Sequence, residues 1–358
     1  MAITKIPSAG FQDNVKFRNI IINGSMDIAQ RGTSETGITG SSFVVDRFKF
    51  LPSSMGTWTQ SQSTTVPSGQ GFANSLKLDC TTADASPSAG DHIRLLYNIE
   101  GQHLQYLKKG TSSAESTTLS FWVRSNKTGT YICELYDHSN SRQISQAYTI
   151  SSADTWEKKT LTFAGDTTGA FTNSNAIALS CTFFLGAGSN FTSGTLSTTW
   201  TSSTNANRAV GQVNLGDNTA NEWYVTGIQL EAGTSASDFE FLPVDVNLQR
   251  CLRYYYQVID GSSQSLAVSA YVDTGQIRTV INFKEVMRSA PSVVTSDGTD
   301  HFRAENPSDQ FDGNWTVLNA STRSSAIYST DNVSGTQGDA VVVRSSSSDA
   351  RLAFNSEL

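Results

Sequence analysis

Charged residues are scarce in this 358-residue sequence, at 16% of the chain, and no run of Lys or Arg is present. The formal net charge is −7 at pH 7. A protein that holds nucleic acid regardless of its sequence needs clustered cations that contact phosphates. We therefore do not expect nucleic acid as a partner.

Long apolar runs and a secretion signal are also lacking. The longest apolar runs are as short as a strand, whereas a helix that spans a bilayer needs roughly 20 residues. The residues that follow Met1 contain no apolar core of a signal peptide. These features predict a protein that neither inserts into a membrane nor is secreted by means of a signal peptide.

Cysteine is rare, and the four cysteines lack the CxxC spacing of zinc sites. We expect each to be reduced and buried as a small apolar side chain: Cys80, Cys133, Cys181 and Cys251. The sequence predicts neither a metal site nor a cofactor.

Signatures of catalysis are missing as well. The chain has no GxSxG nucleophile turn, no GxxxxGK[ST] phosphate loop and only four scattered histidines. We expect no enzymatic activity. The enzymatic alternative would be a polysaccharide depolymerase with two carboxylates that flank the scissile bond.

Many short alternating segments are present instead, separated by Ser, Thr, Asn and Gly. The chain is longer than one average core requires. We predict an all-β fold, with a jelly-roll β-sandwich followed by a short helix and a second, smaller β-sandwich.

The segment QLEAGTSASDFEFLPVDVNLQRCLRYYYQV, residues 229–258, predicts where the first domain ends. A strand leads into a Gly/Ser turn, a proline, an amphipathic segment that Asp245 could cap, and three tyrosines, at least one of which should be buried. Burial of apolar residues there predicts a stiff joint. The predicted parts are a leader at 1–16, the jelly roll at 17–243, a connecting helix at 244–253 and a C-terminal sandwich at 254–358.

Alternation and turn residues also predict the main strands. We expect strand 223–230 to lie beside strand 17–23, and we expect one or two helical turns within 91–110. Other strands are predicted at 42–51, 74–80, 156–163, 176–186, two within 117–139, 254–259, 266–273, 276–285, 291–296, 325–329, 338–344 and 351–355.

Two groups of motifs resemble known families. A short helix ending in Gly110 followed by TLSFWVRSNKTGTY (118–131) resembles carbohydrate-binding modules of the galactose-binding-like jelly-roll type. A second group resembles tail-fibre and other virion-surface proteins of tailed bacteriophages: INGSMDIAQRGTS (22–34), VDRF (45–48), GIQLEAGTSASDFEFLPVDVNLQRCLRYY (227–255), FKEVMRSAPSV (283–293) and NSEL (355–358). This resemblance implies a structural role, a homotrimer, and attachment to other virion proteins through the N-terminal segment.

A sugar site is predicted on strands within 117–139. Alternation places Trp122 and Arg124 opposite the core face of the first strand, and Glu134 and Tyr136 on one face of the next. If the two strands form a hairpin, these side chains make one aromatic and charged patch, and sugars bind aromatic faces beside polar groups. The alternatives are a cross-strand Arg124–Glu134 ion pair and a Trp122 buried between subunits.

Two further tryptophans, Trp58 and Trp200, fall in polar segments that we predict to be loops. Each is either an exposed contact residue or an anchor that pins its own loop. Arg47 lies in an apolar strand, so we expect it to pair with Asp46 or Glu231 for structural reasons.

The sequence thus predicts a bacteriophage virion protein, made in the host bacterial cytoplasm and located on the virion surface. The first hypothesis is a tail fibre or fibre tip that binds host cell-surface polysaccharide. The second is a capsid or tail decoration protein without receptor binding, and the third is the depolymerase described above.

Overall fold

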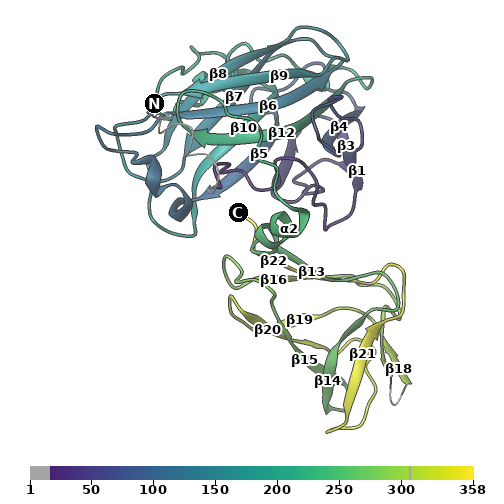
Figure 1. The fold of residues 1–358 in the computed structure, drawn as a ribbon. Coiled ribbons are helices and arrows are strands. Elements are labelled where there is room, and N and C mark those ends of the chain that lie inside the picture. Colours follow the sequence, from purple (N-terminus) through teal and green to yellow (C-terminus); the bar gives the residue numbers. More distant parts are fainter. Residues whose placement is uncertain (1–16, 306–307) are drawn as a thin grey trace, which may run out of the picture.

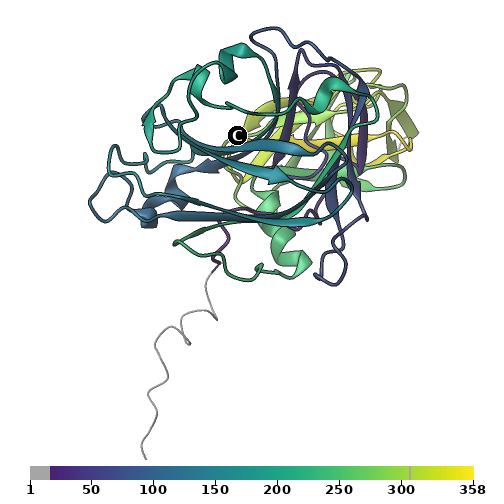
Figure 2. The same cartoon turned by 90° about the horizontal axis from the view of Figure 1, so that it is seen from above.

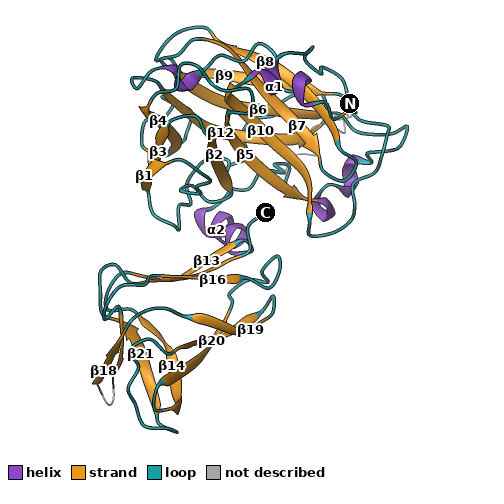
Figure 3. Cartoon of the chain, turned by 180° about the vertical axis from the view of Figure 1, so that it is seen from behind, coloured by secondary structure: helices purple, strands orange, loops and turns teal. Residues whose placement is uncertain are grey.

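The computed structural model describes residues 17–305 and 308–358, and it confirms the predicted all-β fold. A larger β-sandwich lies above a smaller β unit in Figure 1, and helix α2 (Val244–Leu252) lies between them. Strands dominate both units in Figure 3. The predicted leader at 1–16 lies outside the described residues.

The first sandwich consists of two antiparallel sheets, each of six strands among the described residues. In spatial order, sheet 1 contains β1 (Ser34–Ile38), β3 (Thr57–Ser63), β4 (Ser75–Thr82), β12 (Glu222–Ala232), β6 (Thr117–Ser125) and β9 (Glu157–Phe163). Sheet 2 contains β11 (Thr201–Ser202), β8 (Arg142–Ile150), β7 (Gly129–Asp137), β10 (Ile177–Ala187), β5 (His92–Glu100) and β2 (Phe48–Ser53).

The core of this sandwich follows from alternation along the strands. In β6, Leu119, Phe121 and Val123 are fully buried between the sheets, as predicted. Trp122 and Arg124 point to the opposite face and stay partly exposed. All four cysteines are buried and unbridged, in agreement with their predicted role as small apolar side chains.

The second unit also contains two antiparallel sheets within the described residues. Sheet 3 has β13 (Tyr255–Asp260), β22 (Arg351–Asn355) and β16 (Ser292–Thr295). Sheet 4 has β18 (Ser308–Phe311), β17 (Phe302–Glu305), β21 (Ala340–Ser345), β14 (Ser265–Asp273), β15 (Gln276–Asn282), β20 (Ser324–Ser329) and β19 (Thr316–Ala320). Each strand predicted in this part of the sequence is present, while β17, β18 and β19 were not predicted.

Helical structure is confined to short pieces in the described residues. Besides α2 these are α1 (Ser189–Thr192) and single 3₁₀ turns at Gly101–His103, Gln105–Leu107, Asn205–Asn207 and Leu215–Asp217. The helical prediction for 91–110 is thus partly wrong, because β5 occupies its first half. None of the helices found in residues 17–305 and 308–358 is long and apolar enough to cross a membrane.

Two strand predictions in the first sandwich are wrong. Residues 17–23 form loop and turn, not a strand, although they do lie beside β12 through backbone hydrogen bonds from Ile20 to Leu230 and from Ile228 to Gly24. The strand predicted at 42–51 begins only at Phe48. Arg47 has a φ of 75°, a left-handed conformation that breaks the extended backbone.

Helix α2 ties the cores of the two units together. Its residue Cys251, with the following Tyr254, belongs to the core of the first sandwich, while Leu252 and Tyr256 belong to the core of the second unit. Leu248 packs against both cores. All three tyrosines of the joint are buried, and the N-cap position is Pro243 and not the predicted Asp245.

A network of buried charges surrounds this helix. Arg47, whose side chain is 2% exposed, forms an ion pair with Glu357 and donates a hydrogen bond to the carbonyl of Asn98 at 2.7 Å. Its guanidinium carbon also lies 3.4 Å from the centroid of the Tyr254 ring, within cation–π distance. The predicted pairing of Arg47 with Asp46 or Glu231 is therefore wrong, because Glu357 reaches it from the far end of the sequence.

Three more hydrogen bonds fix the residues around Glu357. Arg288 donates to the carbonyls of Ser356 at 2.6 Å and Glu357 at 3.1 Å, and Asn98 donates to the carbonyl of Leu358 at 2.9 Å. Viewed from above, the strands of the second unit lie behind the first sandwich and overlap with it (Figure 2). Glu357 and Leu358 thus contact the first sandwich through Arg47 and Asn98, while Arg288 of the second unit holds the backbone of the same segment.

Replacing Glu357 with Gln should destabilise the protein strongly. The substitution leaves the buried guanidinium of Arg47 without its carboxylate, which costs about 3 kcal/mol. The matched control is Glu305→Gln, because Glu305 is 44% exposed and pairs with Arg344 in solvent. That exposed pair should contribute less than about 1 kcal/mol. Urea unfolding of the two variants measures the difference, and equal losses would contradict the structural role of the buried pair.

Asp46 gives the stability of the joint a defined pH dependence. Burial, opposed by Arg31 and by hydrogen bonds from Gln30, raises the pKa of this carboxyl to about 6. Because the folded pKa lies above the unfolded value, the group stabilises the fold below about pH 4, and this contribution is lost as pH rises through 6.

The unfolding free energy of the wild type should therefore fall relative to that of Asp46→Asn as pH rises from 4 to 7. A shift of about two pKa units corresponds to a change of up to about 3 kcal/mol. The control Asp349→Asn removes an exposed charge and should follow the wild type over the same range. Chemical unfolding at several pH values tests this, and a difference that changes in the opposite direction would refute it.

Candidate functional site

The predicted sugar patch is divided between the two sheets. β6 and β7 follow each other in sequence, but β6 pairs with β12 and β9 while β7 pairs with β8 and β10. Trp122 and Arg124 consequently lie on the outer face of sheet 1, and Glu134 and Tyr136 lie on the outer face of sheet 2. The predicted hairpin is wrong because the turn between the strands crosses from one sheet to the other.

The predicted Arg124–Glu134 ion pair is also absent, since both residues have other partners. Arg124 pairs with Asp154 at 2.8 Å and with Glu222 at 3.1 Å. Glu134 is fully buried and accepts two 2.7 Å hydrogen bonds from the guanidinium of Arg208. These partners leave both charges with little capacity for a ligand.

Tyr136 is the one residue of the sheet 2 pair that remains partly exposed. The guanidinium of Arg208 lies over its ring at 4.9 Å, and the ring of His138 contacts it edge-on at 4.8 Å. These neighbours cover the ring and bind it to the loop that contains Arg208. Tyr136 is therefore a weaker candidate for sugar stacking than Trp122.

The two loop tryptophans are not exposed contact residues. Trp58 lies in β3, is fully buried, and donates from Nε1 to the carbonyl of Met55 at 2.7 Å. Trp200 is half-buried and donates to the carbonyl of Ala164 at 2.7 Å, with the ammonium of Lys109 5.3 Å from its ring. Both tryptophans are therefore structural anchors, which was the alternative that the sequence left open.

Trp122 lines a cleft of about 310 Å³ on the outer face of sheet 1. In the register of the sheet it lies between Lys158 on β9 and Thr226 on β12. The other walls come from two loops, residues 69–72 and 238–241. We call this the Trp122 cleft, and its lining residues are Gly69, Gln70, Phe72, Ser120, Trp122, Lys158, Gly227, Asp238, Phe239 and Phe241.

Three phenylalanines form the aromatic wall of the Trp122 cleft. The ring centroids of Phe72, Phe239 and Phe241 lie 4.8–5.1 Å apart in edge-to-face or tilted pairs. Phe72 is buried, whereas Phe241 is 52% exposed at the mouth. An exposed phenylalanine held by two others presents a rigid apolar surface to solvent.

The loop that carries Phe239 and Phe241 is fixed by polar residues of β12. Glu231 accepts hydrogen bonds from the backbone nitrogen of Ser237 at 2.8 Å and from its hydroxyl at 2.7 Å. Gln229 accepts from the backbone nitrogen of Glu240 at 2.8 Å. Glu231 therefore supports the aromatic wall, a role that its sequence position did not reveal.

Polar groups of the cleft are free to bind a ligand. No hydrogen bond is recorded, among the described residues, for the side chains of Lys158, Gln70 and Asp238 or for Nε1 of Trp122. Lys158, Gln70 and Asp238 are exposed to solvent. The cleft thus combines aromatic faces with unsatisfied donors and acceptors, the combination that sugars require.

Sequence reasoning found Trp122 but missed the phenylalanine wall. The available signal was the pair Phe239 and Phe241 in SDFEF, two large aromatics within an otherwise small and polar segment. Their contact with Phe72 joins residues about 170 positions apart, which periodicity cannot reveal. In the part of the chain that is described, no three His, Cys, Asp or Glu side chains are grouped to bind a metal.

No protein-family model matches the chain, and no curated protein matches it either. Among solved structures, the enzymatically active domain of tailspike protein 4 from bacteriophage CBA120 shares 13% identity over 60% of this chain, with a TM-score of 0.31. The matched part is 21% of the tailspike chain, so this chain spans about a fifth of that structure.

Two carbohydrate-binding modules are similarly remote. The family 11 module from Clostridium thermocellum, solved with a mixed-linked tetrasaccharide, shares 8% identity over 57% of this chain and 99% of its own, with a TM-score of 0.30. A family 61 module solved with β-1,4-galactotriose shares 8% identity over 60% of this chain and 99% of its own, with a TM-score of 0.25. Likeness at this distance assigns no function.

Replacing Gly227 with Ala should disrupt the Trp122 cleft. Gly227 has a φ of 62°, and an added Cβ would lie 2.5 Å from the ring of Phe72. The left-handed backbone costs about 1 kcal/mol for alanine, and the clash with Phe72 should add about 1–3 kcal/mol. Gly37→Ala is the matched control, because Gly37 has a φ of 71° and open space around it. Urea unfolding of both variants compares the losses, and equal losses would show that Phe72 is not packed against Gly227.

Proposed function

We propose that this protein is a non-catalytic, glycan-binding component of a bacteriophage virion, most simply a tail fibre or fibre-tip protein. The observation that carries the glycan part is the Trp122 cleft, in which Trp122 and the half-exposed Phe241 stand beside unpaired polar side chains. A pyranose ring has apolar C–H faces and polar edges, so it can stack on the aromatics while its hydroxyls bind Lys158, Gln70 and Asp238.

The chemistry of the cleft favours binding over cleavage. Glycoside hydrolysis requires two carboxylates on either side of the bond, and Asp238 is the one acidic residue among those that line the cleft. The cleft also lies on an outer sheet face and is open to solvent through Phe241. An open platform suits an internal stretch of a polysaccharide chain, so host cell-surface polysaccharide is the ligand class that we propose.

The virion part of the proposal rests on the motif resemblance. We propose that the protein is made in the host bacterial cytoplasm, is displayed on the virion surface, forms a homotrimer, and attaches to other virion proteins through residues 1–16. Four unbridged cysteines suit folding in a reducing cytoplasm.

A second function, a decoration protein that contacts its own copies, has one specific observation in its favour. Val268 and Val280 are 71% and 58% exposed on the outer face of sheet 4. Val342, directly opposite Val268 on β21, is 37% exposed. A contiguous apolar surface of this kind is typical of a protein interface, and it lies on a different unit from the Trp122 cleft. A decoration protein of this kind would not bind a receptor, so binding experiments decide between the two functions.

Trp122→Ala and Phe241→Ala should each weaken binding to the polysaccharide on host cells by at least about tenfold, as expected for a central stacking residue. Tyr136→Ala, on the opposite sheet, is the matched control and should bind like the wild type. The assay is the binding of fluorescently labelled protein to host cells, before and after removal of the polysaccharide, with circular dichroism as a check of the fold. Wild-type binding by a folded Trp122→Ala variant would refute the glycan site.

A further inference from the structure

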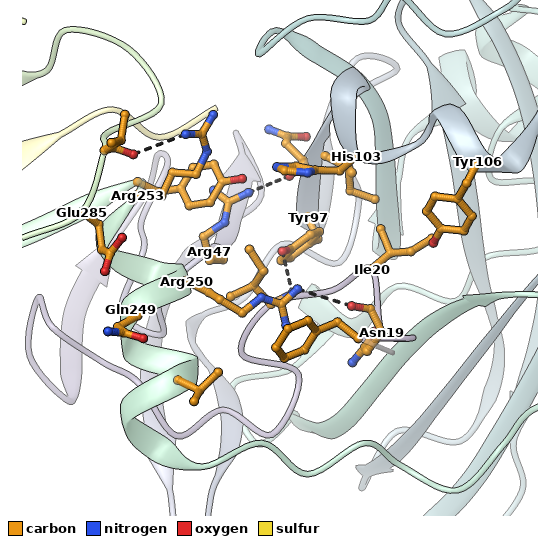
Figure 4. A pocket seen from close by; sticks show the side chains of 17 residues that line it. Asn19, Ile20, Arg47, Tyr97, His103, Tyr106, Gln249, Arg250, Arg253 and Glu285 are labelled. Carbon is orange, nitrogen blue, oxygen red and sulfur yellow. Dashed lines mark hydrogen bonds between the residues drawn. The ribbon is translucent and has the colours of Figure 1, made fainter. Parts of the chain in front are cut away.

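A second and larger cavity, of about 630 Å³, lies where the first sandwich meets α2 and the second unit. Figure 4 shows Arg250 and Gln249 extending from α2, with Asn19, Tyr97, His103 and Tyr106 of the first sandwich on the other sides. The volume is typical of a small-molecule site. We call this space the joint cavity, and no part of the proposed function uses it.

The three arginines that line the joint cavity differ in their partners. Arg47 pairs with Glu357, and Arg253 pairs with Glu100 at 2.7 Å. No ion pair is recorded for Arg250 within the described residues. Its guanidinium lies 5.3 Å from the centroid of the Phe17 ring, and it makes one long hydrogen bond, of 3.5 Å, to the carbonyl of Asn19. Most of its donors are therefore available to a ligand.

Arg47 adds a buried guanidinium to the wall of the joint cavity. Nε of Arg47 is buried and has no hydrogen-bond partner, although both terminal nitrogens of the same guanidinium are paired. A buried donor without an acceptor is costly. A carboxylate bound in the joint cavity would lie among the residues Arg47 and Arg250, both of which line it.

The remaining wall suits a sugar ring. Tyr106 is 51% exposed, and Gln249 is exposed on α2. Neither side chain has a recorded hydrogen bond in the described part of the chain, so a phenol and an amide face the cavity with free polar groups. Phe17 and Ile20 complete an apolar side.

From these observations we infer that the joint cavity binds a carboxylate-bearing sugar of one or two rings, with its carboxylate on Arg250 and its ring against Tyr106. A guanidinium and a carboxylate form two parallel hydrogen bonds, so a single unpaired arginine selects one carboxylate and offers no advantage to a neutral sugar. Because residues of the first sandwich and of α2 both contact the ligand, binding holds the two units in one arrangement. The site is independent of the Trp122 cleft.

Titration of the full-length protein with sodium glucuronate and sodium galacturonate tests this inference, with glucose and galactose as neutral probes. Isothermal calorimetry measures affinity and stoichiometry, and the NMR signal of the Arg250 Nε–H group reports where the ligand binds. We expect one uronate per chain, a shift of that signal, and binding of neutral sugars at least about tenfold weaker.

Arg250→Gln should weaken uronate binding by at least about tenfold, while Arg250→Lys, which keeps the charge but loses the planar fork, should be intermediate. The matched control is Arg278→Gln, an exposed arginine on sheet 4, which should bind like the wild type. Trp122→Ala should also bind like the wild type, and this separates the joint cavity from the proposed function.

Equal affinity for glucuronate and glucose would overturn the inference, as would wild-type affinity in a folded Arg250→Gln variant. Inorganic phosphate that binds as tightly as glucuronate would overturn the assignment to a sugar. If Arg250→Gln does not fold, the uronate affinity of Arg250→Lys and the shift of the Arg250 Nε–H signal in the wild type test the inference instead.

Discussion

The buried ion pair between Arg47 and Glu357 is the interaction on which the arrangement of the two units depends. It joins residues 310 positions apart, with both side chains at most 5% exposed. A buried guanidinium is tolerated only when its charge is neutralised. Glu357 supplies the charge and Asn98 one acceptor, while the ring of Tyr254 covers one face. Losing any of these partners would favour separation of α2 from the first sandwich.

The motifs that resemble phage virion proteins meet at this joint. Arg47 comes from VDRF and Arg31 from INGSMDIAQRGTS, and both pair with Glu357 of NSEL. Helix α2 comes from the motif that ends in the tyrosines, and Arg288 comes from FKEVMRSAPSV. Arg31 repeats the pattern of Arg47, since it contacts both Glu357 and the Tyr255 ring. The resemblance therefore concerns a conformationally fixed connection between domains. Such a connection would hold the Trp122 cleft in a constant direction relative to the second unit.

Much of the fold was predictable because local alternation and turn residues determine strands. Spacing alone was enough to predict the core face of β6 and the helix before the tyrosines. It also predicted seven strands of the second unit. Spacing does not predict which strands pair, because a short turn can either form a hairpin or connect two different sheets. The turn between β6 and β7 connects sheet 1 with sheet 2. Burial of Trp58 was missed since a Ser/Thr-rich strand with one tryptophan has the composition of a loop. The phenylalanine wall and the partner of Arg47 depend on contacts between distant residues, which no local pattern encodes.

The central claim is that this joint makes the first sandwich and the second unit one rigid body. Residual dipolar couplings of backbone amides in a weakly aligned sample test it most directly, because they report the orientation of each unit independently. The account predicts that a single alignment tensor fits the couplings of sheets 1 and 2 together with those of sheets 3 and 4. Two distinct tensors would show that the units reorient relative to each other despite the buried pair, and would contradict it.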